Sequence, residues 1–197
     1  DALPALESKP QPRMRLARLA SRALPRLAVQ HPAQVPALLQ LVVPVLLESR
    51  APVDGAALSE ALHIGLAVAA RCDTRTAGAL VKLAANSSPT DGELQGVAVQ
   101  TGLGLAPLLS PQSASEAVSL LDTLLEKSSP SPEMTAALVQ AKIGILPDME
   151  KQSGLGAVVS ALSNTRKHLR RSPQAAQAFV VGAFALYPVG LGPTHDG

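Results

Sequence analysis

Basic side chains are the residues of this chain best suited to bind another molecule, and they form two rows. The rows are Arg15, Arg18 and Arg22 near the amino end, and Arg166, Lys167, Arg170 and Arg171 in a later segment. Guanidinium groups three or four residues apart lie on one face of a helix, where they suit carboxylates or phosphates. We therefore expect both rows to contact a partner. The alternative is a pair of solvent-exposed helix faces on which arginine stems cover apolar surface.

The partner is expected to be a protein rather than a nucleic acid. The net charge is only +2, and residues 27–165 hold seven basic against twelve acidic side chains. Aromatic residues make up 2% of the chain, so the basic rows lack the interleaved aromatic side chains on which single-stranded bases stack. RNA is the alternative partner for the same two rows.

Residues with catalytic or metal-binding chemistry are scattered. Cys72 is the only cysteine, which excludes an internal disulfide and a multi-cysteine zinc site, and we expect it to be a small buried apolar residue. The four histidines lack metal-ligand spacing: they are His31, His63, His168 and His195. His63 occupies the same repeat position as Gln100 and Lys142, which indicates a position that faces solvent. We expect no catalysis, no cofactor and no metal.

Prolines divide the chain at intervals that suit pairs of helices. They are Pro52, Pro89, Pro130 and Pro173, and the intervals between them are 37, 41 and 43 residues. Two helices of three to four turns, with their connections, occupy about 40 residues. Because the residue before a proline avoids the α region, and proline is favoured in the first turn of a helix, each of these prolines is expected to mark a corner between helices.

A glycine follows each of these prolines, at Gly65, Gly102, Gly144 and Gly182. Glycine inside a helix costs about 1 kcal/mol relative to alanine, so its recurrence indicates positions where neighbouring helices pack closely. A chance pattern in a chain rich in alanine, leucine and proline is the alternative.

Composition favours an all-helical fold. Hydrophobic residues make up 47% of the chain with very few aromatics, so the core must consist of leucine, valine and alanine packed at short range. We predict an all-α protein, an α-solenoid of about four antiparallel helical hairpins. Residues 1–12 are expected to be a linker or the tail of a preceding unit, 13–189 the helical-repeat region, and 190–197 a tail rich in glycine and proline.

Apolar periodicity and turn residues divide the repeat region into nine predicted helices. Their ranges are 13–29, 34–49, 54–70, 74–87, 91–109, 112–127, 133–146, 152–170 and 173–187. Five residues with side-chain oxygens are expected to cap helix amino ends: Asp54, Asp73, Thr90, Ser110 and Ser131.

The last predicted helix is apolar on nearly every side. From Ala175 to Tyr187 the only polar side chains are Gln177 and the tyrosine hydroxyl, and such a helix must be covered on more than one face. Because repeat arrays need polar end units to stay soluble, we expect the chain to be a piece of a longer solenoid whose further repeats cover this helix. A partner protein on the same face is the alternative.

The most apolar stretch, 96–109, is too short to predict a membrane span. It covers 14 residues and contains Gln100 and Thr101, whereas a spanning helix needs about 20 apolar residues. Because the sequence shows neither a disulfide framework nor a signal peptide, a reducing cytoplasmic location is favoured.

Paired helices of about 40 residues with a proline at the corner resemble HEAT and armadillo repeats, over residues 34–187. The runs Gly102-Leu103-Gly104-Leu105-Ala106 and Ser153-Gly154-Leu155-Gly156 are most similar to later repeats of the focadhesin family of very large animal solenoids. The resemblance implies a cytoplasmic scaffold at focal adhesions, linked to the helicase complex that feeds the RNA exosome, with no catalytic motif. The aspartate and arginine that HEAT repeats carry at fixed places are matched only by Asp73 and Arg75.

The function that these observations favour is a non-catalytic scaffold that binds partner proteins. Its partner is expected on the concave face of the stack, which the second helix of each hairpin largely builds. A scaffold for RNA or for an RNA-decay complex, using the same basic rows, is the alternative. An enzyme that depends on further sequence is a third possibility.

Overall fold

The computed structural model describes residues 10–48, 52–87, 91–128, 130–170 and 172–186. Over these residues the chain forms nine α-helices, one short 3₁₀ helix and no strand. The predicted all-α class is therefore confirmed. The first described helix begins at Pro10, three residues before its predicted start, so residues 10–12 of the predicted linker are helical. The rest of that linker, 1–9, and the predicted tail 190–197 lie outside the described residues.

The helices agree closely with the predicted ranges. Their bounds are α2 Pro10–Gln30, η1 Pro32–Gln34, α3 Val35–Leu47, α4 Pro52–Ala69, α5 Thr74–Ser87, α6 Gly92–Leu109, α7 Ala114–Lys127, α8 Pro132–Ser153, α9 Leu155–Leu169 and α10 Pro173–Leu186. Every described bound lies within three residues of its prediction, except the end of α8.

α8 continues seven residues beyond its predicted end at residue 146. Pro147 directly follows the predicted end, and proline cannot donate a backbone hydrogen bond and disfavours helix in the residue before it. The structure keeps Pro147 inside the helix, where Leu146 and Met149 on either side of it are buried. Burial of these side chains outweighs the local preference of proline. The helix ends at Gly154, whose φ of +79° is a conformation that favours glycine.

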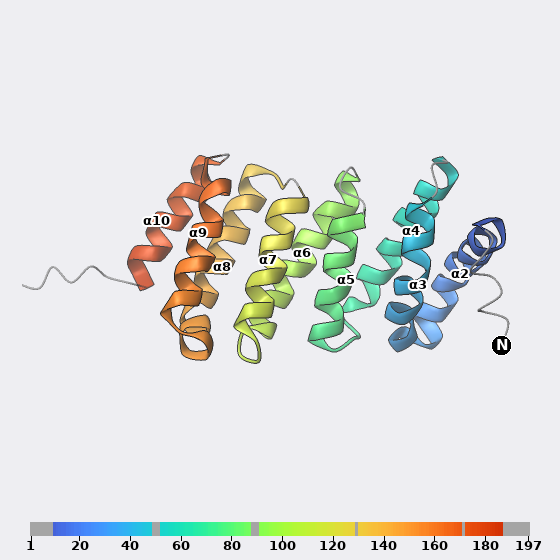
Figure 1. The fold of residues 1–197 in the computed structure, drawn as a ribbon, viewed down its shortest axis with the longest axis horizontal. Helices are drawn as coiled ribbons and strands as arrows, with labels where there is room; N and C mark the ends of the chain where they lie inside the picture. Colours follow the sequence, from blue (N-terminus) through green and yellow to red (C-terminus); the bar gives the residue numbers. More distant parts are fainter. Residues whose placement is uncertain (1–9, 49–51, 88–90, 129, 171, 187–197) are drawn as a thin grey trace, which may run out of the picture.

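The helices lie in two rows along an elongated molecule (Figure 1). The first row contains α2, α4, α6, α8 and α10, and the second row contains α3, α5, α7 and α9. Each helix contacts the helix that follows it and the helix after that one, throughout the described chain. Neighbours in space are therefore neighbours in sequence, and the connections alternate between the two long edges of the molecule.

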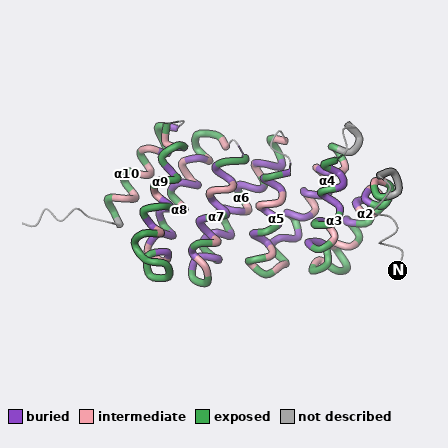
Figure 2. The backbone as a smooth tube through the Cα atoms, viewed as in Figure 1, coloured by how far each residue is buried: buried purple, intermediate pink, exposed green. Residues whose placement is uncertain are grey.

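The core runs along the whole length of the molecule between the two rows (Figure 2). Its largest fully buried apolar side chains are leucines from six of the nine described helices: Leu24, Leu39, Leu46, Leu62, Leu94, Leu120, Leu121, Leu124, Leu138 and Leu146. Burying one such side chain contributes about 1.5–3 kcal/mol. The predicted core of short aliphatic side chains is confirmed for the described residues.

The recurring glycines allow close packing at three of their four positions. A Cβ added to Gly65 would lie 2.6 Å from Leu39 Cδ1, and one added to Gly182 would lie 2.8 Å from Ile143 Cγ2. A Cβ on Gly102 would overlap Leu124 Cδ1. Gly144 has open space around it, so the packing interpretation is wrong at this position. The glycine spacing therefore does not identify one equivalent contact in every unit.

Side-chain caps confirm part of the predicted corners. The backbone amide of Thr76 donates to Asp73, and that of Met134 donates to Ser131, as predicted. The cap of α6 is Asp91, one residue after the predicted Thr90, and Asp54 lies within α4, which begins at Pro52.

Two caps at later corners differ from the prediction. Ser110 stands at the end of α6, and Ser113 caps α7. The pattern also missed Ser172, which accepts a hydrogen bond from the amide of Ala175 at 3.1 Å and so caps α10. Ser, Thr and Asp residues stand close together at several corners, and side-chain chemistry alone does not select among adjacent candidates.

Polar side chains link positions that lie about 40 residues apart. Ser110 donates to Asp148 at 2.6 Å, and Gln152 both donates to the carbonyl of Ser110 at 2.9 Å and accepts from the amide of Ala114 at 2.8 Å. Ser172 donates to the carbonyl of Pro132 at 3.2 Å, across 40 residues. The first links join the α6–α7 corner to the α8–α9 corner, and the last joins the α7–α8 corner to the α9–α10 corner on the opposite edge. They therefore hold each pair of helices in register with the next.

Candidate interaction surface

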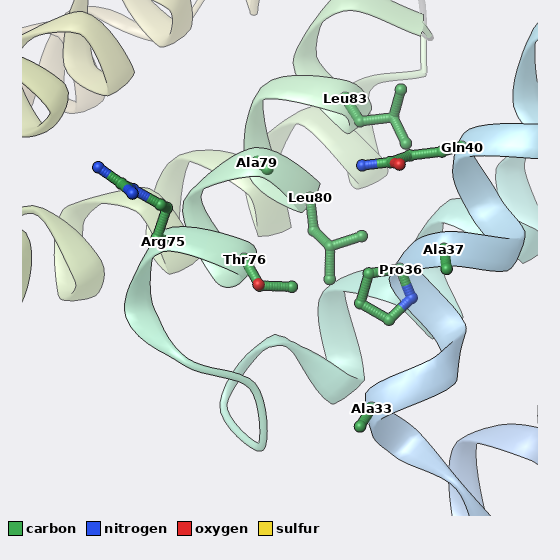
Figure 3. A pocket seen from close by; sticks show the side chains of 9 residues that line it. All are labelled: Ala33, Pro36, Ala37, Gln40, Arg75, Thr76, Ala79, Leu80 and Leu83. Atoms are coloured by element: carbon green, nitrogen blue, oxygen red, sulfur yellow. The ribbon is translucent and has the colours of Figure 1, made fainter.

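A groove lies between α3 and α5 of the second row (Figure 3). It has a volume of about 430 Å³ and is lined by Ala33, Pro36, Ala37, Gln40, Arg75, Thr76, Ala79, Leu80 and Leu83. Figure 3 shows Leu83 of α5 near Gln40 of α3, whereas Arg75 extends away from the groove. The lining is mostly apolar with an amide and a hydroxyl, which suits an apolar side chain of a partner.

The neighbouring groove, between α5 and α7, is bridged by an ion pair. Arg75 donates two hydrogen bonds to Glu116, at 2.7 Å and 3.2 Å, and Lys82 donates to Ser119 at 2.9 Å. The hydrogen bond from Arg75 lowers the pKa of Glu116, although both side chains are exposed. Arg75 is thus engaged within the molecule, and the middle of the second row offers little free positive charge.

α9 carries the predicted carboxyl-end basic row on its exposed side. Arg166, Lys167 and Arg170 are exposed, and they line a hollow together with Ser163 and Leu169. Lys167 forms an ion pair with Glu126 of α7, and this hydrogen bond lowers the pKa of the Glu126 carboxyl. Among the described residues, Arg166 and Arg170 form no ion pair. Arg171 lies outside the described residues.

α2 carries the predicted amino-end basic row. Arg15 and Arg22 are exposed and Arg18 is half-buried, with its carbonyl accepting a hydrogen bond from Ser21 at 2.9 Å. α2 and α9 stand near opposite ends of the long axis in Figure 1. The structure therefore does not bring the two predicted rows together into one binding site.

Lys142 is buried, although the sequence interpretation expected it to face solvent. The position shared by His63, Gln100 and Lys142 was expected to face solvent, but only Gln100 is exposed, His63 is half-buried, and Lys142 is 1% exposed. Lys142 Nζ lies 2.5 Å from Asp122 Oδ1, and burial lowers the pKa of its ammonium group.

A signal for the burial of Lys142 exists in the sequence. Lys142 follows Leu138 by four residues and Val139 by three, so it lies on the face of α8 that both of these buried residues share. Helical spacing from known core residues therefore places Lys142 more reliably than its position in the repeat.

Among the described residues, the cysteine and the histidines do not assemble into a reactive centre, and His195 lies outside these residues. Cys72 is half-buried rather than buried, its thiol donates to the carbonyl of Val68 at 3.5 Å, and burial together with the charge of Asp73 raises its pKa. A raised pKa keeps the thiol protonated and a poor nucleophile. His63 Nδ1 lies 3.0 Å from the carbonyl of Ser59, His168 is buried, and His31 is exposed. In the part of the chain that the structure describes, no three metal-binding side chains cluster.

These features define an all-helical protein with two rows of helices, grooves along the second row, and two arginines at the end of α9, Arg166 and Arg170, that form no ion pair with a described residue. No protein-family model, no curated protein and no solved structure matches the chain. The resemblance to HEAT, armadillo and focadhesin repeats therefore stays a prediction. None of the described helices combines the length and the apolar character that crossing a membrane requires.

Proposed function

We propose that this protein is an α-solenoid of HEAT-like hairpins that serves as a non-catalytic scaffold for partner proteins. The observation that carries the proposal is the unbroken contact scheme, in which every described helix packs on the next two, with polar links about 40 residues apart. Such a scheme extends one surface over many units, which suits the binding of long partner segments. Cytoplasmic location, focal adhesions and membership of a longer array stay predictions.

The second row supplies the binding features. It offers an apolar groove between α3 and α5 and a basic stretch at Arg166 and Arg170 of α9. Unpaired arginines bind carboxylates through two parallel hydrogen bonds, so the partner carries acidic side chains. Charged contacts at an exposed rim steer association and select partners more than they add affinity.

RNA is the competing partner, and the geometry favours it less. One RNA strand that followed both basic rows would have to cross the molecule from α2 to α9. Its path would pass α7, which carries the half-buried Glu116 and the exposed Glu126. The described residues of α9 include no aromatic side chain for base stacking.

Two fluorescent probes of equal charge separate these partners: a polyglutamate peptide and a polyuridine RNA. We expect the peptide to bind the full chain, and Arg166→Glu with Arg170→Glu to weaken its binding by about tenfold. Arg15→Glu with Arg22→Glu at the other end is the matched control and is expected to leave peptide binding unchanged. RNA binding that is tighter than peptide binding and falls steeply with salt would instead support the RNA scaffold.

A further inference from the structure

The surface at the carboxyl end of the two rows, on α9 and α10, has no covering helix among the described residues. On α10, Val181 and Phe184 are 62% and 60% exposed, and on α9, Leu155 and Val159 are 58% and 54% exposed. α10 packs on α8 through its opposite side, where Gly182 meets Ile143 and Ala175 is buried. Large aliphatic and aromatic side chains gathered in this way mark an interaction surface.

Three exposed residues of α9 and Arg170, the residue that follows the helix, form one stripe beside α10. At 100° per residue, Leu155, Val159, Arg166 and Arg170 fall within an arc of about 60° on α9. Lys167 lies further round the helix, on the side that contacts Glu126 of α7. The stripe therefore faces away from α7, on the side where the described rows end. We call the surface formed by the following exposed residues the end surface: Leu155, Val159, Arg166, Arg170, Val181 and Phe184.

The end surface separates its apolar and its basic side chains. Because α9 and α10 are joined by a short connection and run in opposite directions, the first turns of α9 lie beside the last turns of α10. Leu155 and Val159 therefore lie on the same half as Val181 and Phe184. Arg166 and Arg170 occupy the other half, near the corner between the two helices.

An equivalent surface inside the molecule shows what such an end binds. α9 itself packs against α7 and α8, just as a further helix would pack against α9 and α10. There, α9 buries Val158 and Ala161 and completes a charge pair in the last turns of both helices, Lys167 with Glu126. In that internal pair the bound helix, α9, supplies the lysine and α7 supplies the carboxylate. At the end surface the arginines are already present, so the bound helix must supply the carboxylates.

We propose that the end surface binds an acidic amphipathic helix of a partner protein. This helix packs on α9 and α10 in the same way that α9 packs on α7 and α8. The helix runs parallel to α9. Its aliphatic stripe covers Val181, Phe184, Leu155 and Val159, and carboxylates in its last two turns meet Arg166 and Arg170. The proposal rests on the scaffold function and specifies the partner of that scaffold.

A pair of synthetic peptides tests this proposal on the full chain. Each is a capped helix of about 18 residues, roughly 27 Å long, with leucine at every third or fourth position; one carries glutamates in its last two turns, and the other carries lysines there. We expect the glutamate peptide to bind the full chain at least about tenfold more tightly than the lysine peptide, and Phe184→Ala to weaken it by about tenfold. Arg166→Glu with Arg170→Glu should reverse the preference between the two peptides. Leu19→Ala on α2, which also removes an exposed apolar side chain, should change neither affinity.

Each contrary outcome has a distinct meaning. If the glutamate peptide binds but Phe184→Ala has no effect, the end surface is not the site, although the scaffold function survives. If neither this peptide nor polyglutamate binds, the scaffold proposal fails as well. If sedimentation equilibrium shows a dimer that Phe184→Ala dissociates, a second copy covers the surface and the proposal is overturned.

Discussion

The two ends of the molecule carry the same kinds of residues in different arrangements. On α2, the exposed Arg15 and Arg22 alternate with Leu16 and Leu19, so charge and apolar surface are mixed on one helix. On α9 and α10, two arginines occupy one half of the end surface and four apolar side chains the other. A surface with separate apolar and basic halves distinguishes the two directions in which an amphipathic helix can bind, so the carboxyl end is suited to specific recognition. At the amino end, the arginine stems instead cover neighbouring apolar surface.

The stability of the carboxyl-terminal helices depends on a buried ion pair between Lys142 of α8 and Asp122 of α7. No equivalent pair is described on α2. Asp122→Ala would leave Lys142, 1% exposed, without its carboxylate, and we expect a loss of about 3 kcal/mol in the free energy of unfolding. Urea denaturation measures this loss. The double variant Asp122→Ala with Lys142→Met should recover most of the stability, because it removes the buried charge as well. No recovery in the double variant would show that the pair itself is not the cause.

Glycine substitutions test how α10 is attached to the rest of the carboxyl end. Gly182→Ala would place a Cβ 2.8 Å from Ile143, so we expect a loss of about 2 kcal/mol of stability. Gly144→Ala, at a helical position with open space, is the matched control and should gain about 0.5–1 kcal/mol. Equal effects of the two substitutions in thermal unfolding would contradict the packing of α10 on α8.

The cap of α10 contributes a smaller amount. Ser172→Ala removes the acceptor for the Ala175 amide and the donor to the Pro132 carbonyl, and should cost about 1 kcal/mol. Ser160→Ala, whose exposed hydroxyl bonds only within α9, should change stability by less than about 0.5 kcal/mol. Hydrogen exchange of the α10 amides measures the difference, and slow exchange in both variants would contradict the role of the cap.

The smallest expected effect is the pH dependence from Glu126. The hydrogen bond from Lys167 lowers its carboxyl pKa below 4.5 in the folded state, so the folded state binds fewer protons than the unfolded state. Its contribution is therefore fully present above pH 4.5 and is lost as the pH falls through the lowered pKa. Urea midpoints between neutral and acidic pH should fall less in Glu126→Gln than in the unchanged chain. Equal slopes in the two proteins would mean that the ion pair adds nothing to stability.

The fold was largely predictable because its signals are local. Helical periodicity, prolines at the corners and small polar caps all depend on residues close in sequence, and the contacts also join helices that follow one another. The end of α8 was missed because burial around Pro147 outweighs the preference of proline. The burial of Lys142 was missed because the repeat position that it shares with His63 and Gln100 was interpreted as facing solvent, although its spacing from Leu138 and Val139 indicated the core.

The candidate site was only partly predictable. The basic residues of α9 were visible in the sequence, and so was the apolar character of α10. That Lys167 is paired while Arg166 and Arg170 are not depends on Glu126, 41 residues away from Lys167. Which arginines lie beside the exposed side of α10 depends on the packing of three helices, which spacing along one helix does not determine.

Hydrogen exchange of the full chain with and without the glutamate peptide tests the central claim most directly, because it reports both ends of the molecule in one measurement. The account predicts that the peptide slows exchange in α9 and α10 and leaves α2 unchanged. Slower exchange in α2, or equal protection at both ends, would contradict the claim that separated apolar and basic halves make the carboxyl end the site of recognition.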